Sequence, residues 1–259
     1  MADTQRLKSK GIQSVKVSGS IMQALSNSPT PLSLGTLTKL VNLQPGQCHA
    51  YLTSLKKTNL VEQDSESGLY TVGAFAMELG VAWLKSDPIA ISTIELTKKI
   101  SERSGLMSLV SIWGKNGPTI IHVNEASKPM ALNIRQGTTF SVTGSATGNI
   151  FAAFEPTKSK NAVTRELTNR SDFSRSFDTS TSQFWKRIER VRKFRIATTE
   201  GNPIPGINAI AIPIMRSGGG LHFVCTLVGF SHDLKVDKNS WHFKNMKSAL
   251  EEAEQWRER

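Results

Sequence analysis

Residues 32–55 read LSLGTLTKLVNLQPGQCHAYLTSL, and the spacing of their apolar residues predicts two short helices joined by a tight turn. The first helix lies within residues 32–41, with Gly35 as its expected N-cap. Pro45 opens the second helix, because the first helical position does not need a backbone N–H. That helix continues to Leu55 on an apolar stripe at i, i+3, i+4 and i+7, formed by Cys48, Tyr51, Leu52 and Leu55.

The segments on both sides of this pair extend the pattern. Apolar residues recur at helical spacing over residues 14–25, and Pro29 and Pro31 end that helix. Residues 60–72 alternate around a polar turn that ends at Gly68, which predicts a β-hairpin. Three helices followed by a hairpin is the order of a winged helix-turn-helix, a DNA-binding fold. We therefore expect a flexible tail over residues 1–13 and a winged helix-turn-helix domain over residues 14–73.

A second region with a different pattern follows. Residues 74–85 predict a helix, and we interpret residues 74–87 as a linker helix that ends before Pro88. The remainder, residues 88–259, alternates strands and helices, and we expect a mixed α/β domain and an α+β chain overall. The expected helices are 89–103, 147–154, 161–169, 181–194 and 241–259, and the expected strands are 106–113, 119–123, 208–215 and 221–229.

Composition limits the class of protein. The 259 residues are 38% hydrophobic and 20% charged, which suits a packed core. No stretch reaches the ~18 to 20 apolar residues of a membrane span, and the N-terminal residues lack an apolar signal core. Two cysteines, Cys48 and Cys225, suit a reducing compartment. We expect a soluble, cytoplasmic protein without a membrane partner.

The positive charge is not concentrated where the DNA contact is predicted. The formal net charge is +11. Residues 1–73 hold seven Lys and Arg against four acidic residues, whereas the rest of the chain holds 25 against 17. Six of these basic residues lie between Lys186 and Arg195. The prediction of DNA binding therefore depends on helix order and residue pattern, and the charge only adds salt-dependent attraction.

Three motifs that suggest catalysis or cofactor binding fail on spacing. Residues 144–148, GSATG, place Ala146 where a nucleophile elbow needs serine. Gly218–Gly220 lacks the following Lys and Ser or Thr of a phosphate loop, and suits a hairpin turn. The histidines, His49, His122, His222, His232 and His242, show no metal-ligand spacing. We expect no catalytic residue, metal or cofactor.

Four motifs in order along the chain carry a resemblance to a known family. They are residues 32–55, the hairpin SGLYTVG with ELG after it (67–73 and 78–80), GSATGNIFAA (144–153), and PGINAIAIP with a strand ending in VG (205–213 and 228–229). Together they resemble the IclR family of bacterial transcription regulators, over about residues 12–250. The resemblance implies a GAF-like C-terminal effector-binding domain. It also implies a homodimer or tetramer on double-stranded DNA, with a two-fold symmetric assembly matching a palindromic operator.

The resemblance and the helix order together indicate the DNA-contacting residues. Gln44, Gln47, His49 and Ala50 are the candidates for base contact, and Lys39, Lys56 and Lys57 for phosphate contact. The family helix is usually rich in Ser, Thr and Arg near its start, whereas this chain has Gly46, Gln47 and Ala50 there. Base readout must therefore differ from that of its relatives. The alternative is that these residues are ordinary solvated positions.

The resemblance also implies an effector site. Its positions carried over to this chain are Gly144, Ser145, Thr198, Ala209, Thr226 and Val228. Relatives that bind small carboxylates have Asp, Cys and two serines at the last four, so this chain offers fewer hydrogen-bonding groups and more apolar surface. We hypothesise an effector with a hydrophobic or aromatic part. The alternative is that these residues are sheet core.

The sequence therefore favours an effector-responsive, DNA-binding transcription regulator that is not an enzyme. One rival is a small-molecule-binding protein or metabolic enzyme whose N-terminal domain serves oligomerisation. A third hypothesis, RNA binding, is disfavoured because exposed strands show no stacking aromatic residues.

Overall fold

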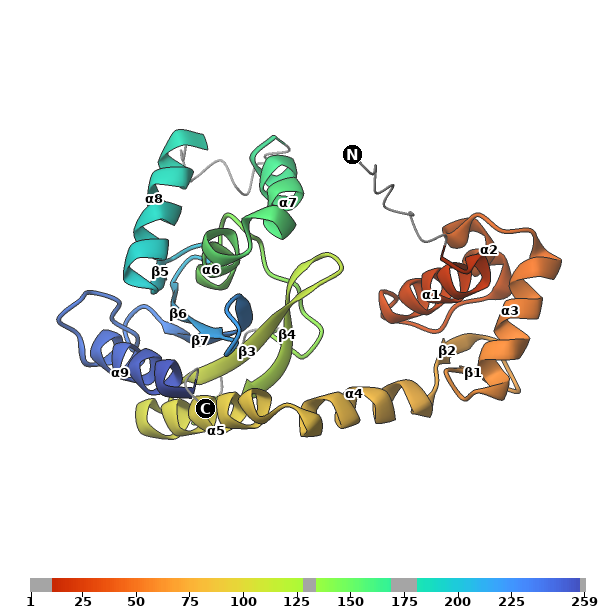
Figure 1. Ribbon diagram of the computed structural model, residues 1–259, viewed down its shortest axis with the longest axis horizontal. Coiled ribbons are helices and arrows are strands. Elements are labelled where there is room, and N and C mark those ends of the chain that lie inside the picture. Colours follow the sequence, from red (N-terminus) through yellow and green to blue (C-terminus); the bar gives the residue numbers. More distant parts are fainter. Residues whose placement is uncertain (1–10, 128–133, 169–180, 257–259) are drawn as a thin grey trace, which may run out of the picture. The chain divides into compact units, whose positions relative to one another are not determined.

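A computed structural model describes residues 11–127, 134–168 and 181–256 (Figure 1). The chain divides into two compact units, Met1–Ser86 and Asp87–Arg259, called here the N-terminal and C-terminal units. Most of the expected tail, residues 1–10, lies outside the described residues, and the first helix begins at Gln13.

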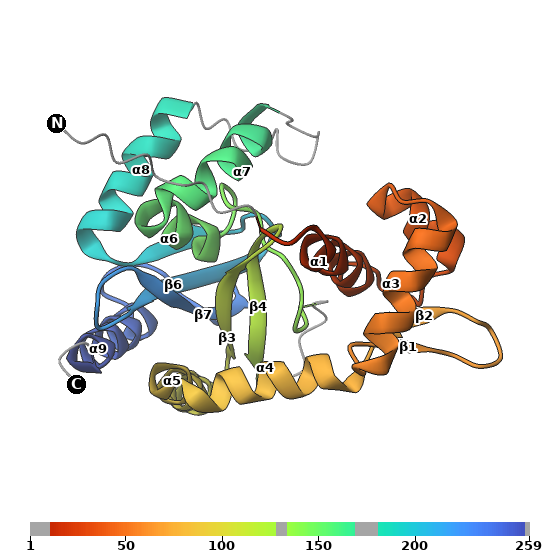
Figure 2. The ribbon, with the colours of Figure 1, turned by 45° about the vertical axis from the view of Figure 1, so that its right-hand side comes forward.

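The N-terminal unit has the predicted order of three helices and a hairpin. Its elements are α1 (Gln13–Ser26), α2 (Leu34–Val41), α3 (Pro45–Lys57), β1 (Val61–Gln63), β2 (Tyr70–Val72) and α4 (Ala74–Ser86). The strands pair antiparallel, with Glu62 opposite Thr71, and Figure 2 shows the loop that joins them. The expected N-cap of α2 at Gly35 is wrong. Ser33 caps the helix, because its hydroxyl accepts a hydrogen bond from Thr36 N at 3.1 Å.

One buried cluster holds the winged helix-turn-helix together. Asn42 turns the chain between α2 and α3 with a left-handed φ of 52°. This turn brings Leu37 of α2 against Leu52 of α3, in a cluster completed by Ile21, Leu25, Cys48, Leu55, Val61 and Tyr70. Cys48 is fully buried as the stripe predicted, and burial raises the pKa of its thiol. Tyr51 is only half-buried at the edge of this cluster.

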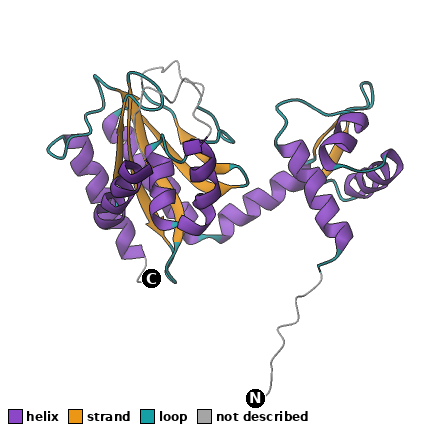
Figure 3. Cartoon of the chain, turned by 90° about the horizontal axis from the view of Figure 1, so that it is seen from above, coloured by secondary structure: helices purple, strands orange, loops and turns teal. Residues whose placement is uncertain are grey.

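The C-terminal unit is built on a five-stranded antiparallel sheet with strand order β4-β3-β7-β6-β5 (Figure 3). The strands are β3 (Met107–Gly114), β4 (Gly117–Asn124), β5 (Ala197–Glu200), β6 (Ile207–Met215) and β7 (Leu221–Phe230). The sequence prediction missed β5, a four-residue strand with only one apolar residue. The predicted turns at residues 114–117 and 216–220 do join β3 to β4 and β6 to β7.

Helices cover both faces of this sheet. On one face α6 (Ala146–Phe154) packs on β5, β6 and β7, with α7 (Pro156–Thr168) and α8 (Thr181–Phe194) beside it (Figure 1). On the other face lie α5 (Pro88–Ser104) and α9 (Trp241–Gln255). Because β6 and β7 are covered on both sides, nearly every residue in them is buried, which explains their continuous apolar runs. The helix expected over 161–169 begins earlier, at Pro156.

Replacing a core leucine tests the assigned core of the N-terminal unit. We expect Leu52→Ala to lower the free energy of unfolding by about 2–5 kcal/mol, because it leaves a cavity among fully buried neighbours. Leu40→Ala is the control, since Leu40 is 60% exposed, and its effect should stay within about 0.5 kcal/mol. Urea titration followed by circular dichroism measures both, and equal losses would contradict the assignment.

Candidate functional site

The start of α3 presents polar side chains on an exposed surface. Gln44 occupies the N-cap position but makes no side-chain capping bond, so its amide is available. Gln47 and Ala50 are exposed one and two turns further on, while Cys48 and Leu52 face the core. His49 is exposed too. The structure thus places all four predicted base-contacting residues in solvent, on a helix of 13 residues that follows a tight turn.

The predicted phosphate-contacting lysines differ in their surroundings. Lys56 Nζ donates to Gln63 Oε1 at 2.7 Å, and the Gln63 amide donates to Gly68 O at 3.0 Å. Lys56 therefore ties the end of α3 to the hairpin. Lys39 and Lys57 are exposed and make no ion pair within the described part of the chain. These two retain ammonium groups free for phosphate.

The hairpin between β1 and β2 is acidic. Asp64 Oδ1 accepts hydrogen bonds from the hydroxyl and the backbone N–H of Ser67, at 2.6 and 2.7 Å, and these bonds lower the pKa of the Asp64 carboxyl. Glu62 and Glu66 add two more carboxylates to the same segment. Since the described hairpin carries no Lys or Arg between Val61 and Val72, it is poorly suited to bind a polyanion.

A second group of predicted residues lies on the α6 side of the C-terminal sheet. Ala209 of β6 pairs with Val228 of β7, so their side chains share a face. Thr226, two residues from Val228, points to the same face, because its hydroxyl lies 2.8 Å from the Thr147 hydroxyl of α6. The structure brings these three predicted residues together on one face.

Thr198 does not join them. It pairs with Ile210, next to Ala209 on β6, and alternate residues of a strand point to opposite faces. The row of Thr198 and Ile210 continues across the sheet to Ser108, whose hydroxyl donates to Thr97 O of α5 at 2.7 Å. Thr198 therefore points toward the α5 and α9 side.

Thr199 takes the position that Thr198 was expected to hold. It pairs with Ala209 and completes a cross-strand row with Val228 and Met107. Its hydroxyl oxygen is buried and has no hydrogen-bond partner among the residues described, which is costly for a polar group unless something else binds it. The sequence reasoning missed Thr199 because it did not predict β5, whose alternation would have distinguished the two threonines.

This row belongs to an apolar group that we call the sheet-face cluster. Segment 134–140 covers it along β4, where Gly137 N donates to Ile120 O and Phe140 N to Pro118 O, each at 2.8 Å. The buried members of the cluster are Met107, Leu109, Ile120, Ile134, Ile207 and Val228, with half-buried Val123, Ala126, Phe140, Ala209 and Phe230 around them. Such surroundings, with one unpaired hydroxyl beside them, suit a ligand with an apolar body and few polar groups.

The segment before α6 is held by one carboxylate. Glu166 of α7 accepts hydrogen bonds from the Ser141 hydroxyl, Val142 N, Thr143 N and the Thr143 hydroxyl, at 2.7 to 2.9 Å. Arg187 of α8 donates to Thr143 O at 2.9 Å, and burial lowers the pKa of its guanidinium. Charged hydrogen bonds of this kind are roughly twice as strong as neutral ones, so this segment has a defined shape.

Gly144 and Ser145 follow this segment and begin α6. Ser145 is the N-cap, and its hydroxyl accepts from Gly148 N at 2.9 Å and donates to Ser141 O at 2.6 Å. Gly148 permits the close approach, because a Cβ there would lie 2.2 Å from Ser141 O. The Ser145 hydroxyl is thus used in capping α6. Gly144 and Ser145 can therefore offer a ligand only their backbone groups.

Three other features bear on metal binding, thiol reactivity and membrane insertion in the described residues. No group of three or more His, Cys, Asp or Glu is placed to hold a metal ion within the described ranges. Burial raises the pKa of the Cys225 thiol to about 12, which keeps it protonated at neutral pH. No helix in the described part of the chain is long and apolar enough to span a membrane.

Comparisons with known proteins bear on the family and the fold of the chain. The family model "Bacterial transcriptional regulator IclR C-terminal" matches residues 81–254. The glycerol operon regulatory protein of Streptomyces griseus is 24% identical over 147 residues, covering 57% of this chain and 58% of that protein. The chain thus aligns with about three-fifths of that relative's length.

Solved structures share the fold. An IclR transcriptional regulator from Alicyclobacillus acidocaldarius is 17% identical with a TM-score of 0.78, covering 96% of this chain and 98% of that one. An IclR homologue from Microbacterium hydrocarbonoxydans, solved in complex with 4-hydroxybenzoate, is 11% identical with a TM-score of 0.70, covering 93% and 98%.

Proposed function

The chain belongs to the IclR family of bacterial transcriptional regulators, and we propose that it is a DNA-binding regulator controlled by a small-molecule effector. The observation that carries this proposal is the presence of an exposed polar helix start and a buried apolar cluster in one chain. The N-terminal unit exposes the polar start of α3, and the C-terminal unit has an apolar sheet-face cluster beside an unpaired hydroxyl. We further propose that it acts in the cytoplasm and catalyses no reaction.

DNA recognition is assigned to α3. A recognition helix reads base edges in the major groove with side chains near its N-terminus. Gln44 and Gln47 are exposed there, and glutamine can pair with adenine through two hydrogen bonds. Lys39 and Lys57 supply phosphate contacts, whereas the acidic hairpin does not. His49 and Ala50 complete the proposed base-reading surface, and Lys56 contributes by holding the hairpin against α3.

A homodimer is proposed from the surface of α4. None of its 13 residues is buried, although most are apolar, and Met77 is 74% exposed. One exposed face of the helix carries residues at helical spacing: Ala74, Met77, Glu78, Val81, Ala82 and Lys85. An apolar helix of this kind needs cover, and a second copy of α4 supplies it with two-fold symmetry. Such a dimer would match a palindromic operator.

The effector is proposed to be an aromatic or partly hydrophobic acid. The sheet-face cluster offers apolar surface from Ala209 and Val228, and the Thr199 hydroxyl offers one polar contact. Gly144 and Ser145 would contribute backbone groups at the start of α6, and Thr226 a hydroxyl shared with Thr147. The 4-hydroxybenzoate held by the Microbacterium homologue has this chemistry.

Two substitutions separate base reading from phosphate contact. Gln47→Ala should weaken binding to the operator by about 1–3 kcal/mol while leaving affinity for random duplex unchanged, because only a base contact is lost. Lys57→Ala should weaken both and lower the slope of log affinity against log salt by about 1. Fluorescence anisotropy on fragments from upstream of its own and neighbouring operons measures both. If the parent chain shows no preference for any such fragment, the assignment of DNA recognition fails.

A charge on α4 tests the dimer. We expect Val81→Glu to give a monomer in analytical ultracentrifugation at concentrations where the parent chain is dimeric, because it places a carboxylate among the apolar side chains of this face. Ile204→Glu is the matched control, since Val81 and Ile204 are both 38% exposed. A dimer that survives Val81→Glu would show that α4 is not the interface.

Adjacent threonines test the effector site. Thr199→Val should weaken binding of 4-hydroxybenzoate about 3- to 10-fold in calorimetric titration, which is the worth of one hydrogen bond. Thr198→Val, on the other face of the same strand, should change it less than about twofold. Tighter binding of glyoxylate or pyruvate than of aromatic acids would overturn the proposed effector class, and equal effects of the two variants would overturn the proposed face.

A further inference from the structure

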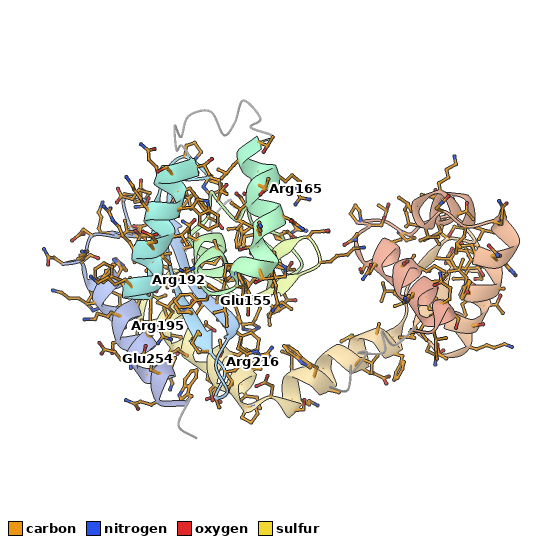
Figure 4. The ribbon with its side chains drawn as sticks, turned by 45° about the horizontal axis from the view of Figure 1, so that its top comes forward. Glu155, Arg165, Arg192, Arg195, Arg216 and Glu254 are labelled. Atoms are coloured by element: carbon orange, nitrogen blue, oxygen red, sulfur yellow. The ribbon has the colours of Figure 1, made fainter. Side chains whose placement is uncertain are left out.

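The basic run between Lys186 and Arg195 divides into two groups in the structure. Three of its six cations are used inside the C-terminal unit. Arg187 donates to Thr143 O and Arg192 Nε to Ala153 O, each at 2.9 Å. Arg195 Nη1 pairs with Glu254 Oε1 of α9 at 2.7 Å, and Figure 4 labels Arg192, Arg195 and Glu254 where α8 meets α9. These three arginines therefore have structural roles, which account for half of the cations in the run.

The other three cations have no such role. Lys186, Arg190 and Lys193 are exposed and make no ion pair or hydrogen bond with any residue that the structure describes. Their spacing of i, i+4 and i+7 places them in one line along α8. The helix buries its opposite side through Phe184, Ile188 and Val191. We call these three residues the α8 cationic row.

A fourth cation joins the row from another segment. Lys238, in the loop before α9, has its Nζ 5.2 Å from the centre of the Phe194 ring, and Lys193 Nζ lies 5.7 Å from the same ring. The ring thus holds both ammonium groups at the C-terminal end of α8. Glu189 is the one carboxylate in α8, and it forms no ion pair with the row in the described structure.

Aligned cations without partners repel one another, so a row of this kind is stabilised by a polyanion. At 1.5 Å per residue the row spans about 10 Å, and one strand of duplex DNA carries about three phosphates over that length, at one per 3.4 Å. Three of the four cations are lysines, which protein–protein interfaces avoid. These features favour nucleic-acid phosphate over an acidic protein surface.

We propose that the α8 cationic row is a second DNA-binding surface, which contacts the phosphate backbone of duplex DNA without reading its bases. This inference extends the proposed function, because it assigns DNA contact to the C-terminal unit as well. It also gives a role to part of the positive charge outside the winged helix-turn-helix, where 25 Lys and Arg face 17 acidic residues.

The test compares two charge-reversed full-length variants. K186E/R190E/K193E removes the row, and K115E/K160E/K244E reverses three exposed lysines scattered over the same unit. Both lower the formal net charge from +11 to +5. On a random duplex of about 40 base pairs, we expect the row variant to lose about 2–3 in the slope of log affinity against log salt relative to the control, since each phosphate contact contributes about 0.9. Its affinity at low salt should be at least tenfold weaker than the control's.

Equal losses in the two variants would mean that only net charge matters, and would overturn the proposal. If the row variant keeps duplex affinity but loses binding to polyglutamate, the row binds acidic protein and the proposal is again wrong. Preference for an upstream fragment over random duplex depends on α3, so it should survive in the row variant. If the parent chain shows no such preference, the proposed function is wrong, but the comparison of salt slopes between the two variants still tests the α8 cationic row. Circular dichroism checks folding, and K186Q/R190Q/K193Q with K115Q/K160Q/K244Q replaces the pair if either variant misfolds.

Discussion

The position of α6 over the sheet depends on the Glu166 carboxylate. It accepts four hydrogen bonds from residues 141–143 and so holds the segment that leads into α6. Gly148 lets α6 approach this segment more closely than any side chain would allow. The helix is thereby fixed over the sheet, where Thr147 meets Thr226 of β7.

The features that short-range spacing encodes could be predicted from the sequence. The stripe of Cys48, Leu52 and Leu55 predicted α3 and its buried face, and the alternation around Gly68 predicted the hairpin. The order of these elements was enough to indicate the winged helix-turn-helix. In the C-terminal unit, the continuous apolar runs of β6 and β7 predicted two buried strands, because this pattern too lies within a single short segment.

Features that depend on distant partners could not be predicted in this way. The strand β5 is short and mostly polar, and it exists because it pairs with β6. Without that pairing nothing distinguishes Thr198 from Thr199, although their side chains point to opposite faces. Glu166 lies 23 to 25 residues from the groups it binds. The sequence also left the N-cap of α2 undecided, because serine and glycine are both acceptable caps. Only the backbone path selects Ser33 over Gly35.

In the proposed function, one chain couples an effector site to DNA binding. An effector can change DNA affinity only if it binds the DNA-competent and DNA-incompetent states differently, and the coupling must be reciprocal. The most direct measurement is the operator affinity of the intact chain with and without a saturating aromatic acid, paired with calorimetry of that acid with and without operator. We predict that both affinities change by the same factor, in the range of about 5- to 150-fold. Operator affinity that stays constant while calorimetry shows the acid bound would mean that the two sites are not coupled.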